Sequence, residues 1–202
     1  MKKLLFLALG LALPLFLQAQ KIVLKSGSLD FLKGQKFLNI QYDYSDMAVG
    51  KYDHEADYVN KKVTEYNEKE PGRGDKWKES WVGDRKGLFQ PKFEELLNKY
   101  LEPKGIFVGP ENKDAKYTLI LKTTFTEPGF NVYVTKKYAS INVEAIFVET
   151  ANPKKVVATI ISKNNPGRTY GTGDFDTGIR IAEAYAKCGK SLGSWLVKNA
   201  LK

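Results

Sequence analysis

A glycine-bearing loop just before the last predicted helix has the residue types best suited to binding chemistry. It runs from Gly171 to Gly178, and Arg168 stands shortly before it. Backbone N–H groups of such a loop, together with a helix N-terminus, can bind an anion. The loop lacks the Lys-Ser/Thr pair of a phosphate-binding loop, and its two carboxylates would repel an anion. The alternative is a connecting loop in which Asp176 or Thr177 caps the helix. The predicted ligand-binding residues are Arg168, Gly171, Thr172, Gly173, Asp174 and Asp176.

An acidic segment surrounds the only histidine of the chain, His54. The carboxylates near it are Asp43, Asp46, Asp53, Glu55 and Asp57. Oxygen-rich clusters can bind calcium, but the spacing and central glycine of an EF-hand are missing. One histidine and one distant cysteine do not make a structural zinc site, so neither a metal nor a cofactor is predicted. A Ser-His-Asp triad needs no adjacent members, yet no nucleophile-elbow serine accompanies His54. The favoured interpretation is a solvated acidic loop, and no catalytic residue is assigned.

Cys188 is the only cysteine, so no disulfide can form within the chain. It could act as a nucleophile together with His54. However, Ile181, Cys188 and Trp195 are spaced by seven residues along the last predicted helix. This spacing favours a packed, unreactive thiol.

Trp77 and Trp81 are four residues apart on one face of a short predicted helix, with tyrosines upstream. They are predicted to form an aromatic platform for a partner. The alternative is that the two rings fix the helix to the core. The tripeptide Arg73-Gly74-Asp75 matches an integrin-type motif, but a three-residue match is common by chance.

The elements that must position these residues follow from hydrophobic periodicity. Short turns at Pro128-Gly129 and Asn152-Pro153 separate three β-rich runs, which predicts an antiparallel meander. An alternating run near the N-terminus predicts one more strand, and residues 20–34 are interpreted as a short strand or an ordered arm. The predicted strands lie near 36–44, 117–126, 138–149 and 155–161.

Apolar stripes at helical spacing predict helices at 56–70, 76–83, 88–101 and 177–201. The last helix carries many small residues, which would allow it to approach a sheet closely. Its predicted buried stripe is Ile179, Ala182, Tyr185, Ala186, Gly189, Leu192, Gly193 and Leu196. The fold class is therefore α+β, with residues 20–202 forming one domain in which helices cover a mostly antiparallel sheet.

Residues 1–19 have the features of a secretory signal peptide. Two lysines precede an apolar run, and the small Ala19 is placed for cleavage. The run is shorter than the roughly 20 apolar residues of a membrane span, and no cysteine follows it for lipid attachment. We expect an exported chain, periplasmic or secreted, soluble, not lipid-anchored, and without a transmembrane helix in its mature form.

The charge balance bears on possible partners. Without the two lysines of the leader, 30 basic residues face 23 acidic ones, a formal charge of +7. This excess favours an anionic surface such as a lipid head group or an acidic glycan, although it also fits a solvated basic surface. The lysines are scattered and form no RNP, zinc-finger or basic-helix pattern, so nucleic acid is not predicted.

Residues 115–158 carry a motif that resembles a known module. The segment Ala115-Lys-Tyr-Thr-Leu119 is followed by Val143-Glu-Ala-Ile-Phe-Val-Glu-Thr150 and then by Lys155-Val-Val157. This is similar to the α/β module of exported Gram-negative envelope proteins, found in the curli-export lipoprotein and the amino-terminal domain of TolB. The resemblance implies a role in envelope assembly without catalysis.

The motif departs from the family pattern in three places. Glu149 replaces the usual Asp, and Thr150-Ala-Asn-Pro153 replaces the usual Thr-Gly turn. The lipid-anchor cysteine of the curli protein is missing, so membrane anchoring and pore formation are not implied. No functional residue is carried over, because fold analogy alone does not assign one.

Together these features favour an exported, non-catalytic envelope protein that binds a protein partner or a ligand. One alternative is an exported hydrolase that uses carboxylates around Asp174, Asp176 and the 43–57 segment. Another is a carrier of a small ligand, which needs an apolar cavity. The sequence does not indicate an oligomeric state.

Overall fold

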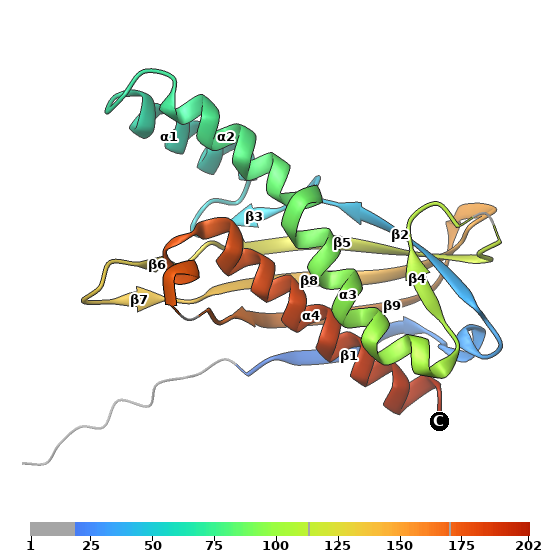
Figure 1. Cartoon of the computed structure of the whole chain (residues 1–202). Helices are drawn as coiled ribbons and strands as arrows, with labels where there is room; N and C mark the ends of the chain where they lie inside the picture. Colours follow the sequence, from blue (N-terminus) through green and yellow to red (C-terminus); the bar gives the residue numbers. More distant parts are fainter. Residues whose placement is uncertain (1–18, 113, 170) are drawn as a thin grey trace, which may run out of the picture.

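The computed structural model describes residues 19–112, 114–169 and 171–202, and its centre is a seven-stranded sheet with helices across one face (Figure 1). Nearly all of the predicted signal peptide, residues 1–18, lies outside the described residues. The strands follow the order β1-β9-β8-β5-β2-β4, and β3 pairs with β5. They are β1 (Lys21–Gly27), β2 (Phe37–Asp43), β3 (Ala48–Val49), β4 (Phe107–Gly109), β5 (Tyr117–Glu127), β8 (Ala139–Glu149) and β9 (Asn152–Gly167).

The predicted meander is confirmed, because β5, β8 and β9 pair antiparallel through short connections. β9 extends to Gly167, well beyond the predicted end at 161. The polar residues after 161 continue the strand, and Asn165 Nδ2 donates a hydrogen bond to the Ile141 carbonyl oxygen of β8 at 3.0 Å. Residues 20–34 provide the edge strand β1, antiparallel to β9.

The prediction of a mostly antiparallel sheet is wrong, because the sheet is mixed. β2 runs parallel to β5, with Asn39 opposite Thr118 and Asp43 opposite Lys122, and β4 runs parallel to β2. Three α-helices separate β2 from β5 in the sequence. A crossover of that length can return the chain to the same edge in the same direction, whereas a short turn cannot.

The predicted helices are present, with shifted ends. They are α1 (Glu55–Asn67), α2 (Arg73–Asp84), α3 (Gln90–Leu101) and α4 (Thr177–Ala200). A π-helical turn at Arg85–Phe89 joins α2 to α3, so the two form one long bent helix in Figure 1. The α1–α2 hairpin projects past the end of the sheet, while α3 and α4 lie side by side across it.

The core lies between the sheet and the α3–α4 layer. Alternate residues of β5 and β8, such as Leu119, Leu121, Ile141 and Phe147, are fully buried. Glycines of α4 bring it close to α3. A Cβ on Gly189 would lie 2.3 Å from the Phe93 carbonyl oxygen of α3, so only glycine fits there.

The predicted buried stripe of α4 is wrong at its first position. Ile179 is exposed, while the neighbouring Arg180 is buried. Hydrophobicity alone favours the opposite arrangement. The inversion arises because the Arg180 guanidinium has hydrogen-bond acceptors inside the fold.

The other face of the sheet has no helix on it within the described parts of the chain (Figure 1). Half-buried Ile120, Ile146 and Ile161 lie there among polar neighbours. Among the helices of residues 19–112, 114–169 and 171–202, none has the length and hydropathy needed to cross a membrane.

Candidate functional site

The predicted ligand loop and the predicted aromatic platform lie at the same end of the molecule. The loop folds as a 3₁₀ turn, η4 (Gly171–Phe175), that leads directly into α4. Phe175 and Asp176 share a groove of about 370 Å³ with Trp77 and Trp81. The structure thus places part of the loop beside both tryptophans, which are about 100 residues away in the sequence.

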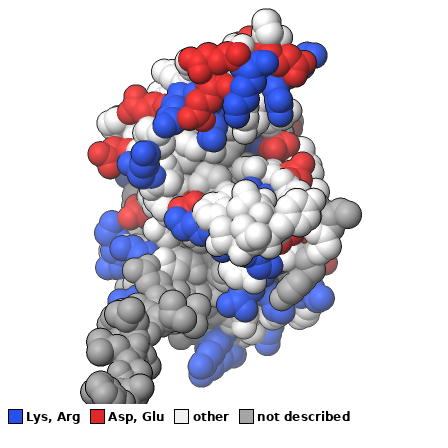
Figure 2. Space-filling model, turned by 90° about the vertical axis from the view of Figure 1, so that its left-hand side faces the viewer, with Lys and Arg blue, Asp and Glu red and all other residues white. Residues whose placement is uncertain are grey.

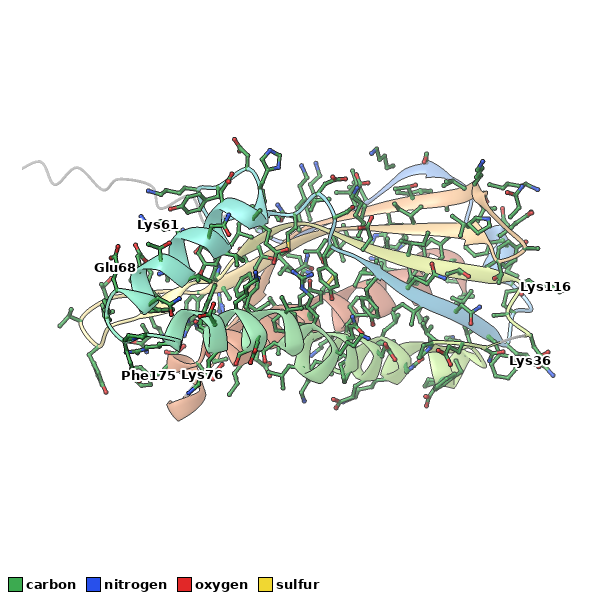
Figure 3. All side chains as sticks on the ribbon, turned by 90° about the horizontal axis from the view of Figure 1, so that it is seen from above. Lys36, Lys61, Glu68, Lys76, Lys116 and Phe175 are labelled. Atoms are coloured by element: carbon green, nitrogen blue, oxygen red, sulfur yellow. The ribbon has the colours of Figure 1, made fainter. Side chains whose placement is uncertain are left out.

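This end of the molecule can be followed in Figure 3. Phe175 lies beside Lys76 of α2, near the tip of the α1–α2 hairpin that carries Lys61 and Glu68. Lys36 and Lys116 lie at the opposite end of the sheet. A small hairpin of β6 (Phe130–Asn131) and β7 (Lys136–Lys137) contacts η4.

Asp174 makes its hydrogen bonds and its ion pair within the chain, at this end of the molecule. Its carboxylate is 5 % exposed and accepts hydrogen bonds from Thr169 Oγ1 at 2.6 Å and Asn131 Nδ2 at 2.6 Å. It also pairs with Lys136 Nζ at 3.4 Å. The hydrogen bond from Thr169, followed by those from Asn131 and Lys136, lowers the pKa of Asp174. Both strands of the β6–β7 hairpin are therefore tied to η4 through one carboxylate.

Arg180 was missed by the sequence analysis and anchors the same hairpin. The side chain is 4 % exposed and donates to the carbonyl oxygens of Pro128 at 3.2 Å, Gly129 at 3.3 Å and Asp174 at 2.8 Å. A fourth hydrogen bond goes to Thr177 Oγ1 at 2.8 Å. Burial lowers the pKa of the guanidinium. The sequence signal was a single arginine within the apolar stretch of the last helix.

Asp176 is the N-cap of α4, since its Oδ1 accepts a hydrogen bond from Ile179 N at 2.9 Å. The carboxylate of Asp84 lies against the same helix start, and a Cβ on Gly178 would be 2.2 Å from Asp84 Oδ2. Burial, and secondly the charge of Asp176, raise the pKa of Asp84. The groove therefore holds two neighbouring carboxylates with different environments.

The two tryptophans belong to an aromatic cluster between α1 and α2. Their rings stack with centroids 5.5 Å apart, and both contact Tyr58 of α1. Trp81 is 5 % exposed, and its Nε1 donates to Glu55, which also pairs with Arg85. Trp77 is only half-buried and lines the groove. The platform for a partner stays a prediction that falls mainly on Trp77.

The other predicted ligand residues are spread out. Gly171 has a φ of 71°, and Gly173 contacts Ile179, so the glycines shape the turn. Nothing is described for the side chain of Thr172. Arg168 is exposed and lines a different groove of about 620 Å³, together with Lys92, Lys187 and Lys190.

The β6–β7 hairpin carries an exposed apolar segment, Val132–Val134, which we name the apex. Tyr133 is 89 % and Val134 is 93 % exposed, and the Tyr133 ring lies 4.9 Å from that of exposed Phe175. The sequence could have indicated this exposed segment, because three apolar residues stand in a predicted turn between Pro128-Gly129 and two lysines.

Three cations follow the apex, namely Lys136, Lys137 and Arg168, which we name the basic collar. Lys136 Nζ lies 4.8 Å from the centroid of the Tyr138 ring, and the Arg168 guanidinium lies 5.6 Å from it. Cations above an aromatic face are attracted by the ring quadrupole. Two of the three collar cations thus lie over one ring at the base of the apex.

The acidic segment does not gather into a site. Asp43 and Asp46 both pair with Lys122, at 3.8 and 2.6 Å, while His54 is exposed. Within the described residues, no group of three or more His, Cys, Asp or Glu side chains could hold a metal ion. Cys188 is fully buried, and burial raises the pKa of its thiol to about 12.

Comparison with known proteins assigns no family. No family model and no curated protein matches the sequence. A Xanthomonas campestris protein described by the family model DUF330 is 16% identical with a TM-score of 0.31, and the match covers 53% of this chain and 60% of that one. A PelC dodecamer from Paraburkholderia phytofirmans is 14% identical with a TM-score of 0.39, covering 91% of this chain and 100% of that one.

The chain thus spans about 60% of the Xanthomonas protein that it matches. Likenesses of this size carry no conclusion about the function of the chain. Neither structure is the curli-export lipoprotein or TolB, so the resemblance of residues 115–158 to that module stays a prediction.

Proposed function

We propose that this chain is an exported, non-catalytic protein that binds a partner at the cell envelope through the end formed by the apex, the basic collar and Phe175. The observation that carries the proposal is the exposure of Tyr133 and Val134 at a protruding hairpin. Contiguous exposed apolar side chains rimmed by polar residues mark interaction surfaces.

The anchoring of the hairpin supports the same proposal. Asp174 binds both strands, and Arg180 binds the backbone just before β6. A surface that is already ordered before binding loses less conformational entropy when a partner arrives. The buried polar groups of this end therefore support the apex and leave it free to make contacts.

A pull-down from native envelope tests the proposal. The chain from Gln20 onward should retain a specific component, and the double variant Tyr133→Ser/Val134→Ser should lose it. The matched control is Val156→Ser, which removes an exposed valine of β9. Equal recovery with both variants, or recovery of nothing specific, would count against the proposal.

The predicted hydrolase is a second candidate, favoured by the groove that holds Asp84 and Asp176. A carboxyl with a raised pKa, here that of Asp84, beside a second carboxyl is an arrangement used in acid–base catalysis. Screening the chain against envelope glycans and peptides should reveal turnover that Asp84→Asn abolishes and the exposed control Asp114→Asn preserves. An inactive chain, or equal rates for the two variants, would exclude it.

A further inference from the structure

The shape of the apex limits what can receive it. Figure 2 faces this end and shows an uncharged surface at its centre, with the charged α1–α2 tip above it and basic side chains below. Val132, Tyr133 and Val134 are all exposed at the turn of the hairpin, so the apolar group is convex. A convex apolar tip can be buried by a deformable surface or by a concave pocket, but not by a flat protein surface.

The backbone of the apex is unusual for its sequence. Tyr133 has a φ of 64°, a left-handed conformation that glycine or asparagine adopts more readily. The turn is held by a hydrogen bond from Tyr133 N to Asn131 Oδ1 at 3.0 Å and another from Val132 N to Thr135 O at 3.1 Å. A tyrosine in this position costs stability and gains little packing, since it is almost fully exposed. Strain kept at such a place points to a function outside the fold.

In the ion pairs behind the apex, the lysine side chains are more exposed to solvent than the carboxylates with which they pair. Lys136 pairs with Asp174, and Lys137 pairs with Glu127. The side chains of the two carboxylates are 8 % and 16 % exposed, whereas those of the lysines are 38 % and 57 % exposed. Arg168 has no carboxylate within ion-pairing distance among the described residues. The outer surface of the collar is therefore positive.

An apolar tip with cations and aromatic rings directly behind it matches the chemistry of a lipid interface. Apolar side chains reach the acyl boundary, tyrosines favour the head-group level, and lysine and arginine meet anionic phosphates. Tyr138 and Phe175 supply the aromatic level here, and the collar supplies the cations. A protein partner would need an apolar pocket with acidic groups placed around its rim. An anionic bilayer offers an apolar acyl region beneath anionic head groups at every point of its surface.

We propose that the apex inserts into the interface of an anionic phospholipid bilayer while the basic collar binds the head groups. This rests on the proposed function, because it names the partner of the same surface. Each basic residue near an anionic surface strengthens binding by about fivefold. Two apolar side chains at the acyl boundary contribute at least about tenfold.

Vesicle sedimentation tests the inference. The chain from Gln20 onward is mixed with vesicles of phosphatidylcholine alone or with added phosphatidylglycerol. We expect binding only to the anionic vesicles. It should be at least about tenfold weaker for Tyr133→Ser/Val134→Ser and about fivefold weaker for Arg168→Gln. The controls Val156→Ser and Lys116→Gln should bind like the unchanged chain. Equal binding to both vesicle types, or by the apex variant and its control, would overturn the inference.

Insertion depth provides a second readout. A polarity-sensitive dye on Val134→Cys should shift its emission to the blue on anionic vesicles, and the same dye on Lys116→Cys should not. The buried thiol of Cys188, with its raised pKa, will not compete for the label. An unshifted dye at Val134→Cys contradicts insertion.

The two proposals fail in different ways. If vesicles do not bind but the envelope pull-down still depends on the apex, the partner is a protein, so the lipid inference falls and the proposed function stands. If neither assay depends on the apex, both fall.

Discussion

Arg180 and Asp174 fix one end of the molecule by opposite means. Arg180 is a buried cation that donates hydrogen bonds mainly to backbone carbonyl oxygens. Asp174 is a buried anion that accepts hydrogen bonds from a hydroxyl, an amide and an ammonium group. Burying either charge is costly unless its hydrogen bonds are made. These two residues therefore determine whether the β6–β7 hairpin is held in place.

Replacing Arg180 by methionine should destabilise the chain strongly. The carbonyl oxygens of Pro128, Gly129 and Asp174 would lose their donor in a buried site. We expect a loss on the order of 3 kcal/mol in the free energy of unfolding, measured with urea. The exposed control Arg168→Met should change it by less than about 0.5 kcal/mol. Similar losses for both variants would contradict the role given to Arg180.

The carboxyls of Asp174 and Asp84 should respond to pH in opposite directions. The pKa of Asp174 is lowered, so the stability it contributes is present above the unfolded value of about 3.9 and is lost as the pH falls through the folded-state pKa. The pKa of Asp84 is raised by burial and by Asp176, so its ionisation destabilises the fold at neutral pH.

We therefore expect Asp174→Asn to lower stability at pH 7 and to flatten its decline on acidification. Asp84→Asn should raise stability at pH 7 and have little effect near pH 3. Urea unfolding at the two pH values measures both effects. The same sign for the two variants at pH 7 would refute the assignment.

At the scale of elements, the contact between α3 and α4 depends on glycine. Gly189 faces the Phe93 carbonyl oxygen and Gly193 faces the Tyr100 side chain, so α3 leaves no room for a side chain at these two positions of α4. Helices that pack this closely have no room for an added methyl group unless one of them moves.

Gly189→Ala should therefore be destabilising although alanine favours a helix. We expect a loss of about 1–3 kcal/mol from overpacking, measured as a lower urea midpoint. Gly83→Ala in α2 is the matched control, because nothing lies within 4 Å of a Cβ there. It should gain about 0.5–1 kcal/mol. A gain for both variants would mean that the helices can separate freely.

The elements that the sequence predicted well are those with a clear period. The alternation along β5 and β8 and the stripe of α3 gave strands and helices within a few residues of their ends. The parallel direction of β2 was not predictable from periodicity, since direction depends on where the α1–α3 crossover returns.

The candidate site was predictable only in part. The loop around Asp174 was predicted to bind a ligand or to serve as a connecting loop, and in the structure the Asp174 carboxylate accepts hydrogen bonds from the chain itself. The apex was overlooked because a turn of three apolar residues has no period at all. Arg180 was overlooked because a buried cation becomes plausible only when its carbonyl partners are known.

At the scale of the whole molecule, the two ends of the sheet differ. One end carries the apex, the collar, η4 and the α1–α2 hairpin, and the other carries the turns that include Lys36 and Lys116 (Figure 3). Helices bury one face of the sheet between them. An elongated layer of this kind can present one end to a surface while the rest of the chain stays in solvent.

Photo-crosslinking in native envelope tests this account most directly. A photoreactive residue in place of Val134 should form an adduct with lipid or with one protein, and the same residue in place of Lys116 should form none. Adducts of equal yield at the two positions, or at Lys116 alone, would contradict the claim that this end of the molecule is the binding end.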